Sequence, residues 1–266
     1  MQYPGRIIRA GEPDADIVKA VKRQLNEALR VSDEGAFRLD PNDPNFGPRV
    51  ERAVKLFQAR HVDVMGNPLT QDGEIGMLTW AVLFGPETVP EHQQTGDEFL
   101  LHVVQVAAEE ARREVREVPT NSNDGPDVRK YLRSVGLGPG FAWCCAFMYW
   151  SFDEAARQLG RPNPMVKTAG CLDHWNKAAT RGARRIRTAE ALDTPDAIAP
   201  GMLFVMDHGH GLGHTGIIEK VTGGLLTTIE GNTDASRTRE GGGVYRLTRK
   251  INQINLGFID YSGSAG

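Results

Sequence analysis

Two adjacent cysteines are the residues of this sequence best suited to nucleophilic chemistry. Cys144 and Cys145 follow a turn rich in glycine and proline, residues 136–140, and they open an apolar pattern that predicts a helix over residues 143–159. Unpaired backbone N–H groups at the start of a helix stabilise a thiolate and can also bind an oxyanion. Cysteines in apolar helices are more often inert core residues, so this motif alone leaves both interpretations open.

A cysteine nucleophile needs a base, and His214, at the head of an apolar strand pattern, is the candidate. Glu230 and Asn232 end the next strand pattern. Because they are two residues apart, an extended chain would place both side chains on one face of a sheet. Either side chain could then accept a proton from the imidazole and fix its tautomer. The alternative, that both residues only begin a turn, stays open at this stage.

Two other segments suggest metal ligands, but their spacing argues against a metal. His208 and His210 precede His214 in a glycine-rich run that lacks the four-residue spacing of paired ligands on a helix. Residues 121–127 resemble half of a calcium-binding loop without its bidentate glutamate, and they suit a turn before a helix that begins at Pro126. We therefore expect no metal and no cofactor.

An α+β arrangement must position these residues, with helices first and an antiparallel sheet after them. Apolar spacing predicts a helix over residues 16–30 with Asp16 as its cap, and a long helix from Glu98 to about Val118 whose charged face, including Glu110, is solvated. Further helices are expected from Val50, around residues 78–83 and over residues 126–135. Short β-rich runs are expected at residues 202–206, 215–221, 225–230, 244–247 and 256–261.

The composition is that of a soluble globular protein with two domains. At 266 residues, 40% apolar and 24% charged, the chain is expected to form a helical domain at residues 1–85, a polar linker at 86–97 and a second domain at 98–266. The formal net charge of −3 gives no field that would attract nucleic acid. The odd number of cysteines, three, favours free thiols over a disulfide framework. We find no apolar stretch typical of a signal peptide or a transmembrane helix, so we expect synthesis in the cytoplasm and no membrane insertion.

Three segments, residues 140–147, 213–218 and 229–233, together carry a resemblance to a known family. With them, residues 98–262 resemble the CHAP domain (cysteine, histidine-dependent amidohydrolase/peptidase), a relative of the NlpC-type and papain-like cysteine peptidases. The resemblance implies a papain-like fold with a central antiparallel sheet. It also implies catalytic roles for four residues, Cys144, His214, Glu230 and Asn232. Cys144 directly follows an aromatic residue, as the family nucleophile does, whereas Cys145 stands where the family usually carries a small residue.

A second resemblance concerns the N-terminal part of the chain. Through residues 46–48, 53–58 and 72–80, the segment 14–85 resembles a three-helix peptidoglycan-binding domain. Its first connection, between Leu29 and Phe46, is longer than in that family. The resemblance implies binding to the bacterial cell wall without assigning the contact residues.

Together the two resemblances imply a monomeric, antibacterial peptidoglycan hydrolase. The bond cut is either the N-acetylmuramoyl-L-alanine amide or a peptide bond of the stem or cross-bridge. We expect it to act on the wall after delivery, either as a phage endolysin released through a holin or as a toxin carried by a secretion apparatus. Two alternatives stay open: a non-catalytic wall-binding protein with a degenerate hydrolase domain, and an enzyme for a cytoplasmic amide such as glutathionylspermidine.

Overall fold

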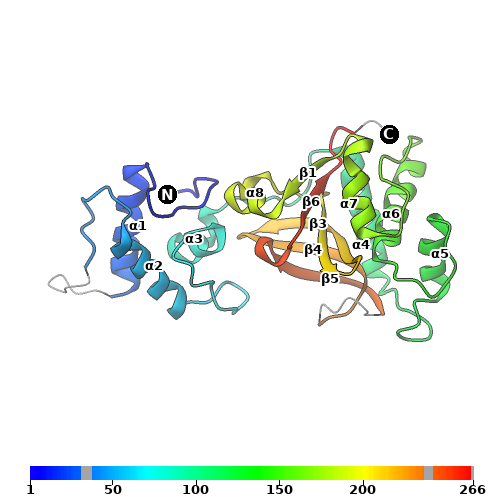
Figure 1. Cartoon of the computed structure of the whole chain (residues 1–266), viewed down its shortest axis with the longest axis horizontal. Coiled ribbons are helices and arrows are strands. Elements are labelled where there is room, and N and C mark those ends of the chain that lie inside the picture. Colours follow the sequence, from blue (N-terminus) through cyan, green and yellow to red (C-terminus); the bar gives the residue numbers. More distant parts are fainter. Residues whose placement is uncertain (31–37, 237–241, 265–266) are drawn as a thin grey trace. The chain divides into compact units, whose positions relative to one another are not determined.

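The structure, a computed structural model, describes residues 1–30, 38–236 and 242–264. The chain divides into two compact units, one of Met1–Pro90 with Leu192–Asp196 and one of Glu91–Ala191 with Ala197–Gly266. The first unit is helical, and the second combines helices with an antiparallel sheet (Figure 1). The α+β class predicted from the sequence is therefore confirmed.

In the described part of the first unit, three α-helices surround one apolar core. Its helices are α1 (Ala15–Ala28), α2 (Pro48–Arg60) and α3 (Met77–Phe84), followed by the short η1 (Pro86–Thr88). The prediction that Asp16 caps the first helix is wrong, because Asp14 accepts hydrogen bonds from the backbone N–H groups of Asp16 and Ile17. A capping side chain bonds two and three residues ahead, so the helix begins directly after Asp14.

A buried glutamine fixes the loop that leads into α3. The Gln58 side-chain amide donates to the Asp72 carboxylate and to the Glu74 carbonyl, both at 2.8 Å, and its oxygen accepts from the Gly73 N–H at 3.0 Å. Gly73 has a φ of +82°, a conformation that favours glycine. The loop is thus held to α2 through one side chain, with its polar groups satisfied inside the core.

The second unit is organised around a six-stranded sheet within the described residues, with the order β1-β6-β2-β3-β4-β5. Every neighbouring pair is antiparallel. The strands are β1 (Arg184–Arg187), β2 (Leu203–Gly209), β3 (Leu212–Thr222), β4 (Leu225–Thr233), β5 (Gly243–Lys250) and β6 (Gly257–Asp260). The central strands β3 and β4 lie next to each other, so side chains that are distant along the chain can meet there.

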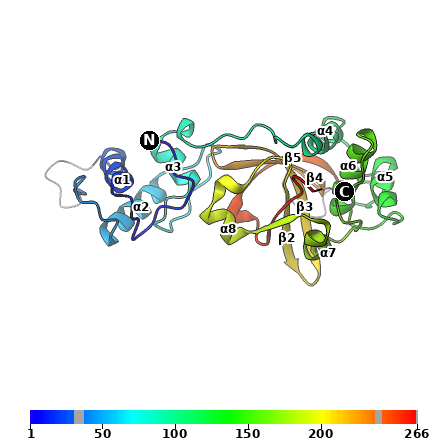
Figure 2. The ribbon, with the colours of Figure 1, turned by 90° about the horizontal axis from the view of Figure 1, so that it is seen from above.

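Helices cover the sheet at β3 and β4. Both α4 (Glu98–Arg112) and α6 (Cys144–Gln158) contact these strands, and α5 (Pro126–Ser134) packs against α6 on the side away from the sheet (Figures 1 and 2). The remaining helices are α7 (Cys171–Lys177), α8 (Thr188–Asp193), η2 (Ala178–Arg181), η3 (Pro195–Ala197) and η4 (Ile251–Gln253). Large buried side chains of this core include Tyr131, Trp143, Phe147, Phe152 and Tyr261. Burial of one such side chain contributes roughly 1.5–3 kcal/mol.

The long helix predicted from Glu98 ends earlier than expected. It stops at Arg112, because Glu114 takes a left-handed φ of +53° and the carbonyl of Val115 then accepts from the N–H of Val244 at 3.0 Å. Pairing with a strand edge outweighs the weak helical pattern of this segment. The sequence pattern does not predict α7, α8 or β1, which are only four to seven residues long.

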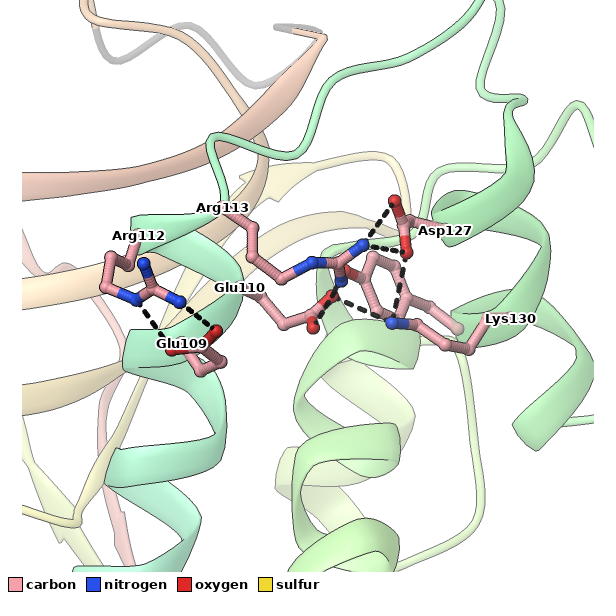
Figure 3. A network of polar contacts seen from close by, with 7 residues as sticks. Glu109, Glu110, Arg112, Arg113, Asp127 and Lys130 are labelled. Atoms are coloured by element: carbon pink, nitrogen blue, oxygen red, sulfur yellow. Dashed lines mark hydrogen bonds and ion pairs between the residues drawn. The ribbon is translucent and has the colours of Figure 1, made fainter.

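The charged face of α4 is not uniformly solvated, which corrects the prediction for Glu110. This carboxylate is 4% exposed and accepts from Arg113 at 2.7 Å, from Lys130 at 2.9 Å and from the Tyr131 hydroxyl (Figure 3). Asp127 completes the cluster by pairing with Arg113 and Lys130. Buried charges need partners of this kind, and the cluster ties α5 to α4.

Candidate active site

Trp143 positions the start of helix α6. It is fully buried, its indole N–H donates to Glu117 Oε1 at 2.8 Å, and its carbonyl accepts from the N–H of Phe147, also at 2.8 Å. Strand β4 approaches closely on the other side, because a Cβ at Gly231 would stand 2.6 Å from the Trp143 ring. The backbone that carries Cys144 is therefore fixed from both sides.

The two adjacent cysteines have different surroundings. Cys144 is the first residue of α6, is 3% exposed, and has its Sγ 3.5 Å from Sγ of Cys171 at the start of α7. Cys145 is fully buried, and its thiol donates to the Thr168 carbonyl, also at 3.5 Å. All three cysteines are free thiols. His214 interacts with the Cys144 thiol and acts to lower its pKa.

His214 lies on β3 and is held by a carboxylate. Its Nε2 is 2.7 Å from Oε2 of Glu230 on the neighbouring strand β4. Its Nδ1 is buried and has no hydrogen bond within the described residues, although Cys144 is close enough to raise the pKa of the imidazole. Because Nε2 is occupied by Glu230, Nδ1 is the nitrogen left to exchange a proton with the thiol.

Glu230 is the most heavily bonded group of the site. It is fully buried and accepts from His214, from the Thr228 hydroxyl at 2.5 Å, and from Nε and Nη2 of Arg249, both at 2.6 Å. Arg249 comes from β5 and is 6% exposed. Two parallel bonds from one guanidinium to one carboxylate form the strongest common geometry for such a pair.

The pKa values follow from these contacts. Burial raises the pKa of Glu230, but hydrogen bonds and charge from Arg249 and His214 outweigh burial and bring it to about 2. Burial lowers the pKa of His214, whereas Cys144 and Glu230 raise it, to about 9. The Cys171 thiol and burial raise the pKa of Cys144 well above its usual range, and His214 lowers it. At neutral pH, Glu230 is thus ionised and His214 is protonated. The charge of His214 opposes the effect of Cys171 and burial on the pKa of Cys144 without outweighing it.

Asn232 does not join this network. Its φ of +56° is left-handed, and the pairing of β4 with β5 shifts register between Glu230 and Thr233. Both amide atoms of Asn232 are buried without a hydrogen bond within the described residues. The expectation of an extended chain through Asn232 is therefore wrong, because a β-bulge breaks the alternation on which it depended.

Two contacts of the site were not anticipated from the sequence. Arg249 was placed beyond the end of a predicted strand, yet β5 continues and buries Leu247 and Arg249 at alternate positions. An arginine at a buried position of an alternating strand requires a carboxylate partner. The alternation through Leu247 to Arg249 could therefore have indicated that Arg249 pairs with a buried carboxylate. Cys171 gave no such signal, because its contact with Cys144 depends on how α7 packs beside β3. A Cβ at Gly213 would stand 2.9 Å from Cys171 Cβ.

The segments considered for metal binding have other arrangements. His208 and His210 are exposed where β2 meets β3, and the described residues include no group of three His, Cys, Asp or Glu side chains that could hold a metal ion. Residues 121–127 form a turn in which the Asn123 N–H donates to Glu117, and α5 begins at Pro126 as predicted. None of the described helices is both long and apolar enough to cross a bilayer.

Comparison with known protein families matches residues 136–232 to the CHAP domain. The matched segment contains Cys144, His214, Glu230 and Asn232, and it excludes Arg249 and most of the first unit. Searches of curated proteins and of solved structures gave no match. The resemblance of the N-terminal part to a peptidoglycan-binding domain stays a prediction. Residues 136–232 are therefore similar to the CHAP domain, and this similarity covers the part of the second unit that carries the candidate site.

Proposed function

We propose that the protein is a cysteine-dependent hydrolase that cuts an amide bond in the peptide part of bacterial peptidoglycan. The observation that carries this proposal is the chain of contacts from Cys144 at the start of α6, through His214, to Glu230. A nucleophile, a base and a group that orients the base are the parts required for acyl transfer.

The proposed reaction has two steps. In the first, the Cys144 thiolate attacks the amide carbonyl carbon while backbone N–H groups at the start of α6 hold the oxyanion. The carbon–nitrogen bond breaks, the proton of His214 passes to the leaving amine, and a thioester remains on Cys144. In the second step, His214 takes a proton from water, the hydroxide attacks the thioester, and the thiolate leaves.

Several features support an active enzyme over the non-catalytic alternative. The buried Glu230 carboxylate holds Nε2 of His214 and leaves Nδ1 without a hydrogen bond in the described part of the chain. An unsatisfied polar atom in a core costs about 1–3 kcal/mol, so it is expected where function requires it. The resemblance of residues 14–85 to a wall-binding domain also favours peptidoglycan over a small cytoplasmic amide.

A digest of purified peptidoglycan tests the proposal and identifies the bond. We expect mass spectrometry to find one new class of amino terminus. An L-alanine terminus would mean an N-acetylmuramoyl-L-alanine amidase, and a terminus inside the stem or cross-bridge would mean an endopeptidase. New reducing sugar ends without new amines would contradict the proposal. Wall binding by the full chain without release of fragments would favour the non-catalytic alternative.

A further inference from the structure

Four buried groups with alternating charge lie in a row within the second unit. The row runs from Cys144 on α6 through His214 on β3 and Glu230 on β4 to Arg249 on β5. In the reactive form these groups are a thiolate, an imidazolium, a carboxylate and a guanidinium, and their charges sum to zero. The row thus extends one residue beyond the nucleophile, base and acid of the proposed function.

Arg249 balances the charge of Glu230. Among the described residues, the charged or titratable groups that contact this carboxylate are His214 from β3 and Arg249 from β5. Cys144 on α6 interacts with His214. Without the guanidinium, a fully buried carboxylate would keep one charged partner and lose two hydrogen bonds. A buried carboxylate in that situation takes up a proton.

A protonated Glu230 would no longer place a negative charge beside the His214 imidazolium. A neutral carboxyl group stabilises the imidazolium far less than a carboxylate does, so the proton on the ring would be held less firmly. The imidazolium is also the group that favours the Cys144 thiolate. The state of Glu230 therefore determines how much of the reactive form is present.

We propose that Arg249 is a positioning residue that keeps Glu230 ionised and oriented toward His214. This inference depends on the proposed function, and it concerns a residue outside the segment matched to the CHAP family. The planar guanidinium suits the role because it meets both carboxylate oxygens at once and lies 5.2 Å from the centroid of the Phe204 ring. Lysine would keep the charge but not the two parallel bonds.

The test compares Arg249→Met, Arg249→Lys and a matched control, Arg246→Met. Arg246 lies on the same strand and also pairs with a carboxylate, Glu219, but this pair is partly solvated. We expect Arg249→Met to slow wall hydrolysis roughly 10- to 100-fold, with the acid limb of the pH–rate profile moved to higher pH. Arg249→Lys should recover part of the rate, and Arg246→Met should behave as wild type.

Carbon-13 NMR of the Glu230 carboxyl gives a readout that does not depend on activity. We expect its titration to move above the ordinary glutamate range in Arg249→Met and to stay intermediate in Arg249→Lys. A folded variant with the wild-type Glu230 titration and pH profile would overturn the proposal. If Arg249→Met does not fold, the Glu230 titration and the pH–rate profile of Arg249→Lys are compared with those of wild type, and a lack of change in both overturns the proposal. If Glu230 shifts but Cys144 is not needed for hydrolysis, the proposed function fails and the positioning contact stands.

The thiols of Cys144 and Cys171 form a close pair within the second unit. Sγ of Cys144 and Sγ of Cys171 are 3.5 Å apart, and both residues begin helices that flank β3. A disulfide requires a sulfur–sulfur distance of about 2.05 Å, so the two sulfurs need to approach by about 1.5 Å. We infer that this thiol pair is an oxidation site for hydroperoxides. Sγ of Cys144 would take one oxygen from the hydroperoxide as its O–O bond breaks, which forms a sulfenic acid and releases an alcohol, or water when the oxidant is hydrogen peroxide. The Cys171 thiol would then displace that oxygen as water and form the disulfide.

Mass spectrometry of unreduced peptides tests this inference whatever the activity of the protein. After hydrogen peroxide treatment of Cys145→Ala, we expect a cross-link between residues 144 and 171 that dithiothreitol reverses. In a Cys171→Ala variant we expect Cys144 to be oxidised further, to sulfinic acid, which dithiothreitol does not reverse. Absence of the cross-link in folded Cys145→Ala would overturn the inference.

Discussion

Replacement of Cys144 by alanine is expected to lower the rate of peptidoglycan hydrolysis by about 10³-fold or more, because the thioester can no longer form. Loss of turbidity of a wall suspension measures this rate. The variant should still sediment with walls if the first unit binds them. Since Cys144 lies at the start of α6 against the Cys171 thiol, alanine removes the sulfur without adding bulk.

The adjacent cysteine supplies the matched control for this experiment. Cys145→Ala also removes one buried thiol from the same helix, but that thiol bonds to the Thr168 carbonyl. We expect its rate to stay within a few-fold of wild type, with a modest loss of stability. Loss of hydrolysis in Cys145→Ala alone would mean that Cys145 is the nucleophile. Full activity in both variants would contradict the proposed role of Cys144.

Glu230→Gln is expected to destabilise the fold much more than Glu219→Gln does, because it leaves the Arg249 guanidinium buried without an anion. Removal of one partner from a buried ion pair costs roughly 3–5 kcal/mol. Urea unfolding followed by tryptophan fluorescence measures the change, since three of the four tryptophans lie in the second unit. Glu219→Gln, which breaks the partly solvated pair with Arg246, should cost no more than about 1 kcal/mol.

The pH dependence of stability provides a second check on Glu230. Its pKa in the folded chain is about 2, below the ordinary 4.5, so its ionisation stabilises the fold at pH values above 4.5. This contribution, roughly 3 kcal/mol, is lost as the pH falls from 4.5 to 2. The difference in unfolding free energy between wild type and Glu230→Gln should therefore shrink between pH 5 and pH 2. A constant difference would mean that Glu230 is not ionised in the native state.

Much of the fold could be predicted because the helices and strands carry regular apolar spacing. The helices α1, α5 and α6 lie within two residues of their predicted bounds, α2 begins two residues before its predicted start, and the five predicted strands all exist. The elements that were not predicted are those in which the run of regularly spaced apolar residues is short or interrupted. α7 has seven residues and β1 has four, which is too few to show a period.

The candidate site likewise has features that are local in the sequence and contacts that are not. The residue types, a thiol at a helix start and a histidine at a strand head, are local features, so the sequence by itself was enough to select Cys144 and His214 as candidates for acyl-transfer chemistry. It also determined the α+β class, because helical and strand periods are local as well.

Only the tertiary structure decided which groups meet. Strand register and a β-bulge placed Glu230, and not Asn232, on His214. The packing of α7 brought Cys171 to the thiol, and the continuation of β5 brought Arg249 to the carboxylate. These contacts join residues 16 to 27 positions apart along the chain. Partners at such separations are selected by the packing of whole elements, which no local pattern of residues specifies.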